Sequence, residues 1–243
     1  MNSIPPPIRP PENRLLERFQ AGLEVLLLSG LVSGFFAAIP FSYRIKKGSA
    51  PGHLDTAVVV GSLLLDACIT FILLWIVMHA HRERLQDFGM RAQRWKEHAV
   101  VGLALVPVLF FANALITQLF RLYLPQFYLD RNPLTEVIKT PFDLGFFILS
   151  AWIAGGIKEE LQRAFILTRF RHHLGGSGLG LFVWSVAFGA GHYVQGLQGM
   201  VAATLFGFLF GAVYLMRRSL VAPIVAHGVY DTLALLGYWY YRN

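Results

Sequence analysis

The chain has a single cysteine and few charged residues. Only 14% of its 243 residues are Asp, Glu, Lys or Arg, whereas a soluble domain of this length normally carries about a quarter. Because Cys68 stands alone, no intrachain disulfide can form. Its position inside an apolar run indicates a small packing residue rather than a nucleophile. These shortages argue against one large soluble core.

Hydrophobic residues make up 55% of the chain and are gathered in long runs that alternate with short charged stretches. A membrane-spanning helix needs about 20 apolar residues, and most of the runs reach that length. The predicted segments are Gly22–Tyr43, Ala57–His79, Ala99–Leu119, Phe142–Ile157, Ser177–Val194, Leu197–Met216 and Val221–Tyr240. The fourth is short unless it continues through its charged end towards Arg171. An eighth span or a re-entrant element between Phe120 and Pro141 is a second possibility.

These segments predict an all-α fold, a polytopic transmembrane helix bundle of about seven to eight spans with a polar intramembrane cavity. We expect residues 1–243 to form a single transmembrane domain. Residues 1–21 form a Pro-rich segment without the pattern of a cleavable signal peptide, so the first apolar run is expected to be retained. Residues 140–240 hold most of the polar residues that lie inside the predicted spans.

The basic residues give a net charge of +7 and predict the orientation. They lie at the ends of apolar runs rather than on one soluble face, so the expected partner is the lipid bilayer and not nucleic acid. With a cytoplasmic N-terminus, twelve fall inside and seven outside, which indicates a multi-pass protein of the cell inner (plasma) membrane. The inside set is Arg9, Arg14, Arg18, Arg82, Arg84, Arg91, Arg94, Lys96, Arg169, Arg171, Arg217 and Arg218; the outside set is Arg44, Lys46, Lys47, Arg121, Arg131, Lys139 and Arg242.

Ionisable residues inside a span cost about 2.5–3.5 kcal/mol each on insertion scales, so each suggests a function. The densest group is Lys158-Glu159-Glu160-Leu161-Gln162-Arg163. On a helix, Arg163 can pair with either glutamate, and a self-neutralised charge cluster is one interpretation. One arginine cannot pair well with two adjacent carboxylates, however. The other interpretation is therefore that one glutamate serves as a general base.

Two histidines lie in later spans. His192 ends the run Phe188-Gly189-Ala190-Gly191-His192, where the small residues allow another helix to approach closely. His227 and Asp231 are four residues apart and share a helical face. With a rise of about 1.5 Å per residue, Glu159 and these three residues fall about 14–22 Å from the inner ends of their helices, near mid-membrane. Each histidine alone is also compatible with a structural hydrogen bond.

Taken together, the three elements resemble the motifs of the CPBP intramembrane proteases (CAAX proteases and bacteriocin-processing enzymes). Those motifs are a Glu-Glu pair followed by Arg, then Phe-x-x-x-His, then His-x-x-x-Asn or Asp. The resemblance covers about residues 140–240 and implies a glutamic endopeptidase without a cofactor or metal. By analogy, Glu159 and His192 would activate water, His227 and Asp231 would stabilise the oxyanion, and Arg163 would hold the Glu159–Glu160 pair.

The chain departs from the family pattern at two places. Three residues usually separate the glutamate pair from Arg, whereas only Leu161 and Gln162 do so here. Either the helix phase shifts, or the pair aligns as Lys158-Glu159, so the identity of the base stays open. Asp231 also stands where Asn is common. An ionised aspartate would repel an oxyanion, so Asp231 must be protonated or must orient a histidine.

Two other functions remain open from the sequence. A metal-dependent membrane hydrolase is possible, since Glu, His and Asp are also metal ligands. A non-catalytic membrane scaffold or regulator with the same fold is the other. The expected substrate of the protease is a membrane-associated peptide or protein, and the sequence does not name it. Glu24 and Asp66, in the first half, are expected to form hydrogen bonds between helices.

Overall fold

A computed structural model describes residues 11–46, 55–90 and 93–242, and the side chains of these except 11–13 and 40–46. The described chain is helical and has no strand. The α-helices are α1 (Pro11–Leu28), α2 (Leu31–Lys46), α3 (Thr56–His81), α4 (Trp95–Tyr123), α5 (Pro141–Ser150), α6 (Glu160–His173), α7 (Ser177–Gly191), α8 (Gly196–Arg217) and α9 (Val221–Arg242). A π-helix, η4 (Ala151–Glu159), joins α5 to α6. Short 3₁₀ helices are η1 (Leu85–Phe88), η2 (Pro125–Phe127), η3 (Pro133–Thr135) and η5 (Tyr193–Gln195).

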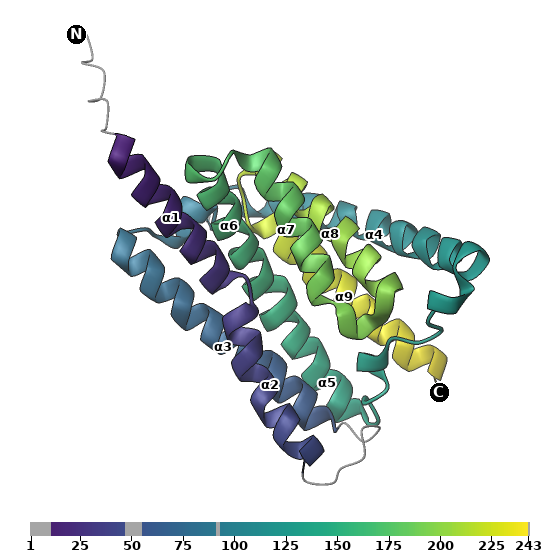
Figure 1. Ribbon diagram of the computed structural model, residues 1–243. Helices are drawn as coiled ribbons and strands as arrows, with labels where there is room; N and C mark the ends of the chain where they lie inside the picture. Colours follow the sequence, from purple (N-terminus) through teal and green to yellow (C-terminus); the bar gives the residue numbers. More distant parts are fainter. Residues whose placement is uncertain (1–10, 47–54, 91–92, 243) are drawn as a thin grey trace.

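The segment α5–η4–α6 runs through the middle of the bundle. Helices α1, α2 and α3 lie on one side of it, and α4, α7, α8 and α9 lie on the other (Figure 1). Both groups contact it directly, α1 and α3 from one side and α7 and α9 from the other. The charged residues of this central segment are therefore enclosed by helices on both sides.

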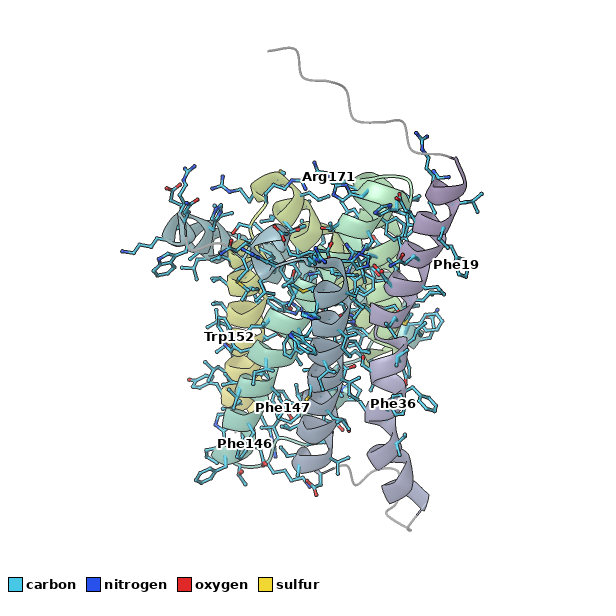
Figure 2. All side chains as sticks on the ribbon, turned by 90° about the vertical axis from the view of Figure 1, so that its left-hand side faces the viewer. Phe19, Phe36, Phe146, Phe147, Trp152 and Arg171 are labelled. Carbon is cyan, nitrogen blue, oxygen red and sulfur yellow. The ribbon has the colours of Figure 1, made fainter. Side chains whose placement is uncertain are left out.

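The outer surface of the bundle is apolar. Among the described residues, four helical segments are long and apolar enough to cross a membrane: Arg14–Ile39, Thr56–His81, Trp95–Tyr123 and Tyr193–Arg217. Large apolar side chains such as Phe19, Phe36 and Phe146 are exposed and point away from the bundle (Figure 2). In water this surface would be costly, whereas in lipid it needs no cover. The predicted all-α membrane bundle is confirmed.

Two predicted segments differ in detail from the structure. The first is broken into α1 and α2 at Ser29-Gly30, where Gly30 has φ +90°, a conformation that favours glycine. The side-chain amide of Gln162 donates to the carbonyl of Leu28, which would otherwise be left unpaired by the break. The fourth segment does continue through its charged end, as far as His173. Between Phe120 and Pro141 the described chain forms only the end of α4, η2 and η3, so no eighth span lies there.

Small residues bring the helices of the second half close together. A Cβ atom added to Gly102 of α4 would collide with the backbone of α9 at Ala222. One added to Gly207 of α8 would lie 3.1 Å from Cα of Ser185 in α7. These glycines allow backbone-to-backbone packing, which is a common way for helices to associate in membranes.

A polar cluster fastens α1 and α3 to α6 at one end of the bundle. Arg169 Nε donates to Glu24 Oε2 at 2.6 Å, and its two terminal nitrogens donate to Glu83 at 2.6 and 2.7 Å. His81 Nε2 lies 2.6 Å from Glu24 Oε1. The prediction that Glu24 bonds between helices is confirmed.

The prediction that Cys68 is a small packing residue is wrong. It is exposed on α3 rather than buried in the core, because that face of the helix turns away from its neighbours. Residues 1–10 of the predicted Pro-rich segment lie outside the described residues, as do Arg9, Lys47 and Arg91 of the charge count.

Candidate active site

The candidate site forms where the π-helix η4 passes into α6. Glu159 is the last residue of η4 and Glu160 the first of α6; α9 packs against η4, and its His227 reaches both glutamates. A Cβ added to Gly155 would lie 3.0 Å from Asp231 Oδ2 and 3.3 Å from His227 Nε2. Glycine at this position therefore lets the polar face of α9 lie against the η4 backbone.

Glu160 and Arg163 form a fully buried ion pair. Their side chains have no exposed surface, and Arg163 reaches Glu160 across one α-helical turn. The guanidinium also lies 4.7 Å from the ring centre of Phe188 in α7 and 5.4 Å from that of Phe210 in α8. The two aromatic rings stabilise the guanidinium cation further through cation–π contacts, at a place where water is scarce. The π-helix η4, in which the helix phase shifts, ends at Glu159, and the chain is regular α-helix from Glu160 through Arg163.

His227 connects the buried Glu160–Arg163 pair to Glu159. Its Nδ1 lies 2.9 Å from Glu160 Oε1. Its Nε2 lies 3.9 Å from Glu159 Oε2 and 3.6 Å from Asp231 Oδ2. Phe210 stacks on the imidazole, with ring centres 4.8 Å apart. Glu160 and the phenyl ring therefore fix the ring so that Nε2 faces the two other carboxylates.

Glu159 and Asp231 are the more accessible members of this group. Their side chains are 18% and 29% exposed, whereas that of Glu160 is 0% exposed. The structure thus separates the two adjacent glutamates by environment. Glu160 is enclosed between Arg163 and His227, whereas the Glu159 side chain is partly exposed.

Lys158 forms contacts that the sequence analysis did not assign. Its ammonium lies 2.8 Å from Asp66 Oδ2 of α3 and 3.5 Å from Glu159 Oε1. The prediction that Asp66 bonds between helices is confirmed. The pairing of Asp66 with Lys158 was not predictable, because the two residues are about ninety positions apart in the chain. The only signal in the sequence was that each residue placed a charge inside an apolar run.

His192 lies beside this group but not in it. Its Nδ1 is 2.7 Å from the carbonyl of Phe188, so that nitrogen carries the donated hydrogen. Within the described residues His192 makes no hydrogen bond or ion pair with Glu159, Glu160 or His227. It contacts the ring of Phe188, which in turn lies against Arg163. The structure therefore brings five of the six predicted residues into one connected group and leaves His192 one aromatic ring away.

A separate cavity of about 700 Å³ lies between the N-terminal ends of α3 and α5. Its lining includes Thr56, Val60, Lys139, Asp143 and Phe146, and no residue of the glutamate–histidine group. In the described part of the chain, no set of three or more His, Cys, Asp or Glu residues is arranged to hold a metal ion.

The comparison with known families agrees with the motifs. Residues 141–233 match the Rce1-like family model, described as type II CAAX prenyl endopeptidase Rce1-like. This match confirms the resemblance to the CPBP and CAAX proteases over that part of the chain. All six predicted site residues lie inside the Rce1-like segment, from Glu159 to Asp231. With the apolar helices, the match indicates a membrane protein with peptidase activity. None of the curated proteins and none of the solved structures matches the chain.

Proposed function

We propose that the protein is an intramembrane glutamic endopeptidase in which Glu159 is the general base. The observation that carries the proposal is the contrast between the two glutamates. Glu160 is enclosed by Arg163 and His227, whereas Glu159 is partly accessible and has Oε2 3.9 Å from His227 Nε2. A base must reach a water molecule and the substrate, and of the two glutamates only Glu159 has an exposed part of its side chain.

In this scheme Glu159 takes a proton from water as the oxygen attacks the peptide carbonyl. The same carboxyl group then gives that proton to the leaving nitrogen. His227 acts as the doubly protonated imidazolium, donating its Nδ1 hydrogen to Glu160 and its Nε2 hydrogen to the oxyanion. Arg163 balances the charge of Glu160, so that the buried carboxylate can hold the imidazole in one orientation.

Asp231 and His192 have supporting roles in the proposal. Asp231 Oδ2 lies 3.6 Å from His227 Nε2, so we assign it to stabilising the charged imidazole rather than to contacting the oxyanion. The Nδ1 of His192 is engaged with the Phe188 carbonyl. This leaves Nε2 as the ring nitrogen that can assist water activation from the α7 side.

The test is cleavage by the purified full-length protein in detergent. The probes are a membrane-peptide library and a peptide with a prenylated cysteine three residues from its C-terminus. Glu159→Gln should abolish cleavage while leaving the thermal unfolding temperature near that of the unmodified protein. Glu160→Gln should lower both, because it removes the partner of Arg163.

Three other outcomes would each reject part of the scheme, and a fourth would refine it. Retained cleavage by Glu159→Gln would exclude Glu159 as the base. Cleavage that a chelator abolishes would assign the chemistry to a bound metal. A folded protein that cleaves no probe would favour the scaffold function. Cleavage restricted to the prenylated peptide would define the substrate class.

We also propose that residues 1–243 form one domain of the inner membrane with a cytoplasmic N-terminus. Arg171 lies at one end of the bundle and Phe146 at the other (Figure 2). Arg171→Cys and Lys139→Cys are each made in a Cys68→Ser background and treated in intact cells with a membrane-impermeant thiol reagent. Lys139→Cys should be labelled, and Arg171→Cys should not. Labelling of Arg171→Cys from outside would reverse the orientation.

A further inference from the structure

The cavity between the N-terminal ends of α3 and α5 is not used by the proposed reaction scheme. Its volume of about 700 Å³ lies within the range of about 300–1,000 Å³ that is usual for ligand sites. Phe146 forms part of its lining and is 57% exposed on the outer surface of the bundle. This residue lies at the opposite end of the bundle from Arg171 (Figure 2). The cavity therefore borders the lipid-facing surface, close to one end of the membrane-spanning segments.

The lining changes from polar to apolar along both of its sides. On α3 it begins at Asp55, the N-cap residue, and continues to Leu64. On the other side it begins at Lys139, next to the N-cap residue of α5, and continues to Phe146. At a rise of about 1.5 Å per residue, the α3 side is about 13 Å long. Because the charged residues lie at the same end on both sides, the cavity fits a ligand with a polar head and an apolar tail, aligned with the helices.

Each of the two helices already carries a carboxylate at its N-terminus. Asp55 Oδ1 accepts the N–H of Ala57 at 2.7 Å. Asp143 Oδ2 accepts the backbone N–H groups of Lys139 and Thr140 at 3.0 and 2.8 Å. An anion is favoured at an open helix N-terminus, but here the two carboxylates hold these positions. The helix ends therefore give no reason for a purely anionic ligand.

The charged side chains of the lining require both signs in the ligand. Lys139 is exposed, and its ammonium forms no ion pair with any residue that the structure describes. A phosphate is a matching partner for a lysine ammonium. The carboxylates of Asp55 and Asp143 only accept hydrogen bonds, so a primary ammonium, which has N–H donors, suits them. A quaternary ammonium has no such donor, and an anionic headgroup would meet two like charges.

We propose that the cavity binds a phospholipid with a zwitterionic primary-amine headgroup, a phosphatidylethanolamine. The phosphate binds Lys139, and the ammonium lies on the side of Asp55 and Asp143. An acyl chain lies against Leu64 and Phe146, which belong to the apolar part of the lining. The lipid fills the space between α3 and α5. The site shares no residue with the glutamate–histidine group, so the proposal is independent of the peptidase chemistry.

The experiment measures which phospholipid stays with the purified full-length protein. The protein is reconstituted into vesicles that contain equal amounts of phosphatidylethanolamine, phosphatidylcholine and phosphatidylglycerol. It is then extracted again in mild detergent, and the lipid that remains bound is quantified by mass spectrometry. Phosphatidylethanolamine should be retained in a ratio near one molecule per chain and should be enriched several-fold over the other two lipids.

Gly61→Leu is the variant that fills the cavity. Gly61 belongs to the lining, and a Cβ added to it meets no atom within 4 Å. The protein should therefore fold, while retention of phosphatidylethanolamine should fall several-fold. Gly145→Leu is the matched control, because Gly145 also has open space around it and lies outside the lining. Lys139→Gln should also lower the retention, because it removes the partner of the phosphate. Ala57→Leu, at another position of the lining, replaces Gly61→Leu if the latter does not fold.

Equal retention of phosphatidylethanolamine by Gly61→Leu and Gly145→Leu would overturn the proposal. Equal retention of the three lipids by the unmodified protein would do the same, and preferential retention of phosphatidylglycerol would reject the zwitterionic headgroup. Thermal unfolding in detergent is a second measurement that does not depend on retention. Added phosphatidylethanolamine should raise the unfolding temperature of the unmodified protein and of Gly145→Leu, but not that of Gly61→Leu. An equal rise in all three proteins would also overturn the proposal.

Discussion

Replacing Arg163 by methionine tests whether the buried ion pair holds the centre of the bundle together. Arg163→Met keeps a flexible apolar chain between Phe188 and Phe210 but leaves the Glu160 carboxylate buried. Removing one partner of a buried pair typically costs about 3–5 kcal/mol. Because His227 Nδ1 remains 2.9 Å from Glu160, we expect the lower value, about 3 kcal/mol.

The measurement is thermal unfolding in detergent, followed by the fluorescence of the five tryptophans. A loss of about 3 kcal/mol corresponds to a fall of about 6–12 °C for a chain of this size. Arg171→Met on the same helix is the control, because Arg171 is exposed and should change stability by less than about 0.5 kcal/mol.

The double variant Arg163→Met with Glu160→Gln decides the cause. It removes the stranded charge, so it should regain about 2 kcal/mol of the loss. If the double variant unfolds at the same temperature as Arg163→Met, the loss comes from packing and the charge argument is wrong. If Arg163→Met alone has no effect, the pair does not stabilise the fold.

Three further substitutions and one control test other contacts. Gly228→Ala places a methyl group against an indole ring of η4 and should cost about 1–3 kcal/mol in thermal unfolding, whereas Gly237→Ala, with open space around it, should be neutral or stabilising. Arg169→Met leaves the buried carboxylate of Glu24 without its arginine partner and should cost about 3 kcal/mol. Thr140→Ala removes the N-cap of α5 and should cost about 1 kcal/mol in the same assay.

Each of these expectations has a result that contradicts it. Equal unfolding temperatures for Gly228→Ala and Gly237→Ala would show that η4 and α9 can separate without cost. An Arg169→Met protein as stable as Arg171→Met would mean that the cluster at the end of the bundle does not fasten α1 to α6. A stability unchanged by Thr140→Ala would show that the N-terminus of α5 is held by other contacts.

The distribution of apolar residues along the chain determined most of the fold. Runs of about 20 apolar residues can bury their backbone polar groups in lipid only as helices, so the segments and the all-α class follow from hydrophobicity alone. The motifs also limited the site to a few residues, because ionisable groups inside a span are rare and costly. The spacing of four residues placed His227 and Asp231 on one helical face, and in the structure His227 Nε2 lies 3.6 Å from Asp231 Oδ2.

Tertiary structure decided what each charged group contacts. The sequence allowed Arg163 to pair with either glutamate, and the packing of α9 and the rings of α7 and α8 selected Glu160. The sequence grouped His192 with Glu159 by depth, whereas the end of α7 turns its Nδ1 to the Phe188 carbonyl. The pairing of Asp66 with Lys158 joins helices far apart in the chain. Such choices depend on the relative rotation and register of packed helices, which the interlocking of small and large side chains sets and which no single segment contains.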